Sequence, residues 1–343
     1  MKIHRIVAMA LAVLTLSLGA WAQDSSRMMG EGGQVHLKAK IHRKWKIRLP
    51  APATKEVGTL LAFKDGLGVD FKAAVDGEAL KLDADGDGVL ETSVEGEGGF
   101  VVLRHKDHRY GLRLAAAPRW SFTPGTTMNG EIDGVKVQLV DQNLNGRFDD
   151  IGEDAIVVGR GKAAAFLSRV IDLGQGHLVN ITVSPDGATL DYSPYTGPRG
   201  RLALKLDTKG KVLTAVLKSV DGDVSVAFSR PEVSLNLPAG EYRFHSAVLS
   251  LGGNRVTART GRSRTITVKA GGESTFELGG PVKAEFAYVR QGDTLNFSPD
   301  NIWFYGRAGE EYYDWAPCGM SPKISVVSKS GREIAEAYFP GSS

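Results

Sequence analysis

Two short acidic segments carry the oxygen donors that a divalent cation needs. The first follows the spacing D-x-D-x-D-G over residues 83–88, and the second follows D-x-N-x-N-G over residues 141–146. Ca²⁺ takes roughly six to eight oxygen ligands, and glycine at position six permits the sharp turn of such a loop. The spacing therefore predicts a calcium site in each segment. The predicted ligands are the side chains of Asp83, Asp85, Asp87, Glu91, Asp141, Asn143, Asn145 and Asp149, together with the main-chain carbonyls of Val89 and Arg147.

Both segments resemble the calcium-binding loops of EF-hands, dockerins and thrombospondin type 3 repeats. They depart from the EF-hand at position twelve, where its bidentate Glu is replaced by Val94 in the first segment and by Gly152 in the second. The flanking residues 79–82 and 135–140 read as strands instead of helices. We therefore expect calcium loops that lie between β-strands.

The missing carboxylate has a candidate in each loop. Glu95 could supply it in the first loop, and Asp150, Glu153 or Asp154 in the second. The alternative is a pair of solvated acidic turns, because Asp, Asn and Gly are also favoured turn residues. Three carboxylates at alternate positions repel one another unless a cation neutralises them, and this repulsion favours calcium. The second loop has fewer anionic donors and is expected to bind more weakly.

A cluster of aromatic residues in segment 297–315 is a second candidate site. Rings can stack on the C–H faces of sugars while carboxylates bind their hydroxyls, so this segment could bind carbohydrate. An aromatic core beneath a long loop is the favoured interpretation, because aromatic side chains dominate small β cores, and sugar binding is the alternative. The aromatic residues are Phe297, Trp303, Phe304, Tyr305, Tyr312, Tyr313 and Trp315, and the neighbouring acids are Asp300, Glu310, Glu311 and Asp314.

Catalytic signatures are otherwise missing from the sequence. It contains no G-x-S-x-G, H-E-x-x-H, C-x-x-C or Walker A motif. His105 and His108 could both face a metal, but a zinc site needs three or four ligands, and exposed turn histidines are the favoured interpretation. A glycosidase needs only two facing carboxylates, so a polysaccharide hydrolase stays an alternative. Its acids would come from Asp149, Asp150 and Glu153, or from Glu310, Glu311 and Asp314.

Residues 1–22 have the pattern of a cleaved secretory signal peptide. Lys2 and Arg5 precede an apolar stretch over 6–18, and residues 20–22 (Ala-Trp-Ala) match the small-x-small cleavage pattern. The mature chain would begin at Gln23 and be secreted or periplasmic. The apolar stretch is shorter than the ~20 residues of a spanning helix, and no later segment approaches that length, so no membrane span is expected.

The charge balance limits the classes of binding partner, and the cysteine content limits the possible disulfides. The chain has 42 basic and 39 acidic residues, and loss of Lys2 and Arg5 with the signal peptide leaves a formal charge of +1. This balance argues against nucleic acid as a partner. Basic residues gather over 36–48, where a solvated strand face is the favoured interpretation and a polyanion-binding patch the alternative. Cys318 is the single cysteine, which excludes an intrachain disulfide.

Alternating apolar and polar residues predict a protein built of β-strands. The alternation covers residues 35–41, 135–139, 202–206 and 233–237. Only residues 163–171 have helical spacing. The predicted fold is mainly β, with two or more antiparallel β-sandwich domains and one short helix after the signal peptide. Asp-Gly pairs, which favour hairpin turns, occur at 65–66, 76–77, 133–134, 186–187 and 221–222.

A run of prolines and glycines over 193–200 predicts a domain boundary, with a long loop inside one sandwich as the alternative. The predicted domains are residues 23–198, with the two acidic loops, and residues 199–343. Residues 237–244 resemble the turn and strand of transthyretin-like (carboxypeptidase-regulatory-like) β-sandwiches, which implies a sandwich without catalysis of its own. A further division near residue 280 would separate this unit from an Ig-like one that ends in a hairpin around 328–331.

Together these features predict an exported, non-enzymatic calcium-binding protein with a structural or adhesive role at the cell envelope. Its expected partner is a cell-surface protein or polysaccharide. The alternatives are the secreted polysaccharide hydrolase and the carbohydrate-binding module that uses residues 297–315.

Overall fold

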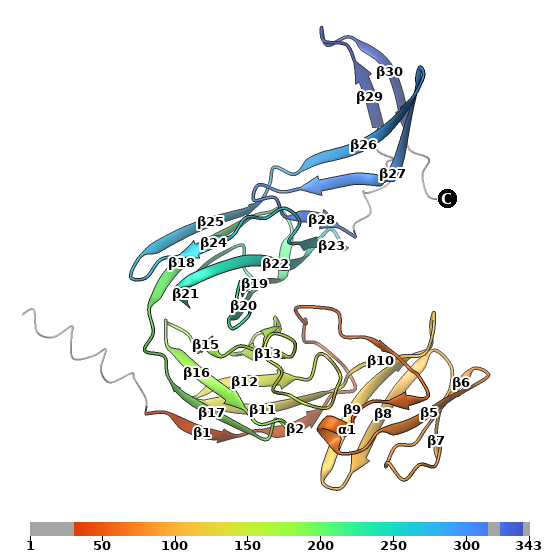
Figure 1. Ribbon diagram of the computed structural model, residues 1–343, viewed down its shortest axis with the longest axis vertical. Coiled ribbons are helices and arrows are strands. Elements are labelled where there is room, and N and C mark those ends of the chain that lie inside the picture. The colour runs from red at the N-terminus through yellow and green to blue at the C-terminus, as the bar shows by residue number, and fades with distance from the viewer. Residues whose placement is uncertain (1–30, 315–322, 339–343) are drawn as a thin grey trace, which may run out of the picture.

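The computed structural model describes residues 31–314 and 323–338 (Figure 1). The described residues confirm the mainly β prediction, since they form several antiparallel sheets and a single short helix, α1 (Lys64–Leu67). The signal peptide predicted for residues 1–22, Trp315 and Cys318 lie outside the described residues. No helix among the described residues has the length and apolar character to cross a membrane.

The first part of the chain builds four antiparallel sheets around a large core, and a smaller cluster of Val140, Ala155, Val157 and Ala164 lies beside it. Two of the sheets have the orders β1-β17-β16-β15 and β14-β13-β12-β11-β2. Their strands are β1 (Gly33–His36), β2 (Lys38–Ile41), β11 (Thr126–Ile132), β12 (Val135–Val140), β13 (Ala155–Val158), β14 (Ala165–Phe166), β15 (Val170–Asp172), β16 (Leu178–Val183) and β17 (Thr189–Pro194). The predicted strand over 35–41 therefore divides at the buried Leu37, and its two halves join different sheets.

The other two sheets of this part carry the first acidic loop. Their orders are β3-β10-β9-β8 and β4-β5-β6-β7. Their strands are β3 (Lys55–Glu56), β4 (Leu60–Leu61), β5 (Phe71–Asp76), β6 (Ala79–Leu82), β7 (Thr92–Val94), β8 (Gly98–His105), β9 (His108–Ala115) and β10 (Ser121–Pro124). Buried apolar side chains of all four sheets, from Leu37 to Leu190, form one hydrophobic cluster.

The second part of the chain is a sandwich of two sheets. The smaller sheet has the order β21-β18-β25, and β18 pairs with β25 in parallel. The larger sheet has the order β20-β19-β22-β23-β28-β27-β26, with β24 paired to β22. Their strands are β18 (Arg199–Asp207), β19 (Lys211–Ser219), β20 (Ser225–Phe228), β21 (Glu232–Pro238), β22 (Gly240–Leu251), β23 (Asn254–Arg259), β24 (Ile266–Val268), β25 (Glu273–Gly279), β26 (Lys283–Gln291), β27 (Thr294–Tyr305) and β28 (Glu311–Tyr313).

A second hydrophobic cluster fills this sandwich. It takes its buried side chains from both sheets, from Leu202 to Tyr312, and adds Val170 and Leu178 of the preceding part. The β26–β27 ribbon extends away from the sandwich, with the hairpin of β29 (Lys323–Val327) and β30 (Glu333–Tyr338) near its far end (Figure 1). The domain boundary at 198/199 stays a prediction.

The prediction of a helix over residues 163–171 is wrong. Residues Ala165–Phe166 form β14 and residues Val170–Asp172 form β15. Nearly every side chain between Ala164 and Ile171 is buried. When a short apolar run is buried on both faces, its hydrophobic periodicity does not distinguish a strand from a helix. Here the residues are extended because they pair with β13 and β16.

The helix that does form was predicted as a turn, because α1 contains the pair Asp65-Gly66. The carboxylate of Asp70 accepts hydrogen bonds from the main-chain N–H groups of Phe63 and Lys64, both at 2.9 Å, which closes the turn. Gly68 ends the helix in the left-handed region at φ 85°, a conformation that glycine adopts without steric cost.

Candidate metal centre

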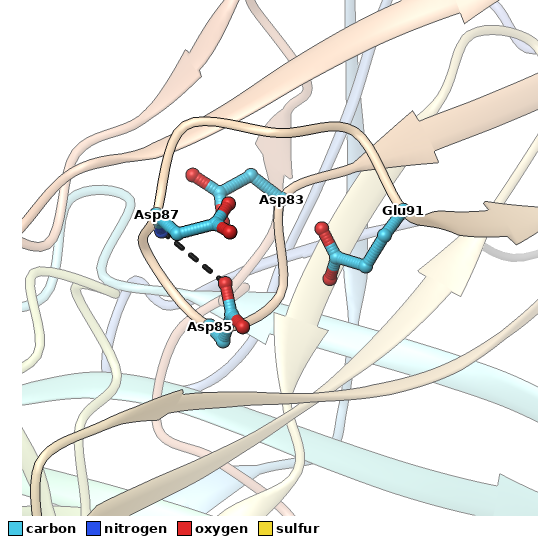
Figure 2. Close-up of side chains that lie close together, drawn as sticks. All are labelled: Asp83, Asp85, Asp87 and Glu91. Atoms are coloured by element: carbon cyan, nitrogen blue, oxygen red, sulfur yellow. Dashed lines mark hydrogen bonds between the residues drawn. The ribbon is translucent and has the colours of Figure 1, made fainter.

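The first acidic loop joins β6 to β7 and gathers four carboxylates, those of Asp83, Asp85, Asp87 and Glu91. One oxygen from each lies within 4.8 Å of one oxygen from every other member. Figure 2 shows the four side chains directed toward the inside of the loop. Asp83 is buried and the other three are exposed. This arrangement offers several anionic oxygens to a single point that solvent can reach.

Hydrogen bonds to Asp83 and Asp87 give the loop its shape. The carboxylate of Asp83 accepts main-chain N–H groups from Gly86 at 2.6 Å and from Gly88 at 3.0 Å. Asp87 donates its N–H to Asp85 at 3.2 Å and accepts that of Val89 at 2.8 Å. Because the main chain is folded around the side chains, the carboxylates are held on the inner side of the turn.

The loop is also fixed to its neighbours. Glu91 reaches back to accept the N–H of Ala84 at 2.8 Å, and the carbonyl of Ala84 accepts the N–H of Arg104 on β8 at 2.7 Å. Lys72 on β5 donates to the carbonyl of Gly88 at 3.2 Å. Glu91 thus belongs to the group of four, whereas the predicted alternative donor, Glu95, lies beyond β7 and outside it.

None of the four carboxylates forms an ion pair with a basic side chain in the part of the chain that the structure describes. Like charges at such short separations repel one another, and a bound cation removes that repulsion. The donors are all hard oxygens, the ligand type of Ca²⁺ and Mg²⁺. The group can therefore hold a metal ion.

The second loop joins β12 to β13 and has a similar pattern of hydrogen bonds. Its first residue, Asp141, is fully buried and accepts the N–H groups of Gly146 at 2.6 Å and Asn145 at 3.2 Å. Asn145 in turn accepts the N–H of Arg147 at 2.8 Å, as Asp87 accepts that of Val89 in the first loop. The shared spacing therefore produces a shared turn.

The donor side chains of the second loop are engaged with each other. The amides of Asn143 and Asn145 both donate to one oxygen of Asp150, at 2.8 and 2.6 Å. Asp149 accepts both the Nε and an Nη group of Arg147, at 3.0 and 2.7 Å. Among the described residues, three carboxylates do not converge here as they do in the first loop.

Buried acids beneath the second loop have strongly shifted pKa values. Burial raises the pKa of Asp141 to about 6, although a hydrogen bond from the Tyr110 hydroxyl at 2.7 Å favours its ionised form. Burial, and then the nearby Asp141, raise the pKa of Asp154 to about 9. Sequence reasoning missed Tyr110, which stands 31 residues before Asp141 and shares no local motif with it.

The two histidines take the places predicted for them at a hairpin turn. His105 ends β8 and His108 begins β9, and the two residues are paired. The ring of His105 lies beside the main chain of Gly86, within reach of the first acidic loop. This proximity was not visible in the sequence.

The aromatic segment is divided among different surroundings. The ring of Phe297 contacts those of Phe286 and Tyr288 on the β26–β27 ribbon, with centroids 5.7 and 5.6 Å apart. Tyr312 belongs to the second hydrophobic cluster, and Tyr313 is exposed. The described aromatic residues therefore form neither one core nor one flat face.

Two acidic residues of this segment, Glu310 and Glu311, form hydrogen bonds with neighbouring groups. Glu310 is fully buried and accepts hydrogen bonds from the N–H of Ala308 at 3.0 Å and the hydroxyl of Tyr312 at 3.2 Å. Glu311 binds the guanidinium of Arg259 through two hydrogen bonds of 3.0 and 2.6 Å. These hydrogen bonds join parts of the fold to one another, so both carboxylates have a structural role.

Comparisons of the chain with protein-family models, with curated proteins and with solved structures found no match. The group of four carboxylates in the first loop is the feature of the described residues that points most directly to a function.

Proposed function

We propose that the protein is an exported, calcium-binding β-protein with a structural or adhesive role at the cell envelope. The observation that carries the proposal is the convergence of four carboxylates, one oxygen of each within 4.8 Å of the others, in a loop with D-x-D-x-D-G spacing. The signal-peptide pattern of residues 1–22 supports export.

Calcium fits this loop better than magnesium or zinc. Ca²⁺ accepts irregular sets of carboxylate and carbonyl oxygens, whereas Mg²⁺ demands near-octahedral geometry and Zn²⁺ prefers His and Cys ligands. In the proposed site Asp83, Asp85, Asp87 and Glu91 supply side-chain oxygens, and the carbonyl of Val89 supplies a main-chain one. The second loop would bind calcium more weakly, because its amides and Asp149 first have to leave Asp150 and Arg147.

The proposed role of the ion is mechanical. Loop residues 83–91 connect β6 to β7, and Ala84 ties them to β8. An ion that binds the folded loop and not the unfolded chain stabilises the fold, by about 2.7 kcal/mol when its concentration is 100 times the dissociation constant. Calcium would thereby stiffen the edge of the first part of the molecule.

Thermal unfolding of the mature chain tests this proposal. We expect millimolar calcium to raise the unfolding midpoint by several degrees relative to EDTA, and millimolar magnesium to raise it less. The double variant Asp85→Asn/Asp87→Asn should lose most of the calcium response. The control for removal of an exposed acid is Asp293→Asn, in the turn between β26 and β27. Equal midpoints in calcium and EDTA, or an unchanged response in the double variant, would refute calcium binding at this loop.

A further inference from the structure

A cleft of about 840 Å³ lies between segment 45–54 and one face of the larger sheet of the sandwich. The segment belongs to the connection between β2 and β3, which reaches the sandwich from the first part of the molecule (Figure 1). Two contacts fix it there: Ser246 donates its hydroxyl to the carbonyl of Pro50 at 3.1 Å, and Arg48 donates to the carbonyl of Leu213 at 3.5 Å. The cleft is therefore built from both parts of the chain.

The floor of the cleft contains two buried hydroxyls. Thr214, Val248, Thr257 and Tyr313 form one row across β19, β22, β23 and β28, because each is paired with the next. Thr214 and Thr257 are 2% and 8% exposed, and their hydroxyl oxygens have no hydrogen-bond partner within the described residues. A buried hydroxyl without a partner is costly, so both favour a polar ligand in the cleft.

The walls of the cleft are positively charged. Arg255 and Arg259 flank Thr257 on β23, two positions away on either side, so all three side chains project from the same face of the strand. Arg48 and Arg113 also line the cleft. Asp314 is the acid among the lining residues, and Glu311, which is not one of them, neutralises Arg259.

Three of these arginines are not neutralised by an acidic side chain of the described residues, so their charge is available to a ligand. Arg48, Arg113 and Arg255 form no ion pair with any residue that the structure describes. The guanidinium of Arg113 stacks over the ring of Trp45, 5.0 Å from its centroid. Its Nε donates to the carbonyl of Pro124 at 3.0 Å, so the stacked guanidinium has its Nη groups left for a carboxylate. Burial also lowers the pKa of Arg113, and a nearby anion would offset that cost.

We propose that this cleft binds an acidic oligosaccharide. The arginines would bind its carboxylates, and Thr214 and Thr257 would pair with its hydroxyls. The cleft volume is in the usual range for small-ligand sites, roughly 300–1,000 Å³. This site is separate from the acidic loop and does not depend on calcium.

An acidic peptide fits the cleft less well. One common mode of peptide binding adds a strand to a free sheet edge, through main-chain hydrogen bonds. The strands of the floor are inner strands of the larger sheet, whose ends are β20 and β26. The groups that face the cleft are hydroxyls and guanidinium ions, which match sugar hydroxyls and carboxylates.

Titration calorimetry on the mature chain tests the proposal, with trigalacturonate as the probe, maltotriose as its neutral counterpart and a hepta-glutamate peptide as the acidic peptide. EDTA is present throughout, so that calcium occupancy of the acidic loop does not affect the result. We expect trigalacturonate to bind at one site and the other two probes to bind at least about tenfold more weakly.

Two sets of variants locate the site. Arg255→Gln should weaken trigalacturonate binding about tenfold, whereas Arg230→Gln, which makes the same charge change in the connection between β20 and β21, should leave it unchanged. Thr214→Val/Thr257→Val should weaken binding at least about fivefold without lowering the unfolding midpoint, because neither hydroxyl has a partner to lose.

Three outcomes would overturn the proposal. They are an absence of trigalacturonate binding, equal or tighter binding of hepta-glutamate, and equal losses in the Arg255 and Arg230 variants. The last would show attraction by overall charge alone. All three leave the calcium proposal untouched, since calcium is chelated in these measurements.

Discussion

At the scale of residues, the two acidic loops share a turn and differ in what their donors contact. Both begin with a buried Asp, Asp83 or Asp141, that accepts main-chain N–H groups. In the first loop the remaining acids face one another, whereas in the second Asp149 faces Arg147. The sequence could indicate the shared turn, because the spacing of Asp, Asn and Gly determines it. It could not indicate Tyr110, which reaches Asp141 only through the tertiary fold.

The hydrogen bond from Tyr110 to Asp141 gives a prediction for stability. Both side chains are buried, so Tyr110→Phe leaves a buried carboxylate without its hydroxyl donor and should lower the free energy of unfolding by about 1–3 kcal/mol. Tyr192→Phe is the matched control, because the Tyr192 hydroxyl donates to Asp133 at 3.0 Å in an exposed position. Urea denaturation measures both. Equal losses of unfolding free energy in the two variants would show that burial does not strengthen the hydrogen bond between Tyr110 and Asp141.

At the scale of elements, the strands that present the loops were predictable. Alternation identified β6 and β12, and Asp133-Gly134 forms the expected turn between β11 and β12, with φ values of 48° and 77°. The two errors have one cause. In both segments the conformation depends on which nearby groups pair with the main chain, β13 and β16 for residues 163–171 and the Asp70 carboxylate for α1, and the spacing of apolar residues does not determine those pairings.

The contact of α1 with the second loop gives a prediction about packing. A Cβ atom at Gly66 would lie 2.1 Å from the main-chain carbon of Gly146, although Gly66 itself has no left-handed φ. Gly66→Ala should therefore force α1 and the loop apart and lower the free energy of unfolding by at least about 1–3 kcal/mol.

Gly58→Ala is the control for this variant. A Cβ atom there would meet only the carbonyl oxygen of Leu60, at 3.8 Å, so little change is expected. Urea denaturation of both variants is the measurement. If Gly66→Ala were as stable as Gly58→Ala, the close approach of α1 to the second loop would be contradicted.

At the scale of the whole molecule, the sequence indicated the class of fold and the acidic loops but not the cleft. The basic run over 36–48 was interpreted as a solvated strand face, with a polyanion-binding patch as the alternative. The structure places Arg48, at the end of that run, in the cleft beside Arg113. The hydrogen bond between Ser246 and Pro50 joins residues 196 positions apart, a separation over which no local pattern extends.

The aromatic segment illustrates the same limit. Its composition favoured an aromatic core beneath a long loop, with a sugar-binding face as the alternative, yet Tyr312 enters the core while the next residue, Tyr313, lines the cleft. Successive residues of a strand point to opposite faces, so this division follows once β28 is an inner strand. The sequence alone did not determine which sheet would receive it.

Crystals of the mature chain grown in calcium chloride, with anomalous diffraction recorded at long wavelength, test the central claim most directly. We predict an anomalous peak inside loop 83–91, with oxygens of Asp85, Asp87 and Glu91 at roughly 2.3–2.6 Å from it. A saturated crystal with no peak in this loop, and with these carboxylates turned apart into solvent, would contradict the account.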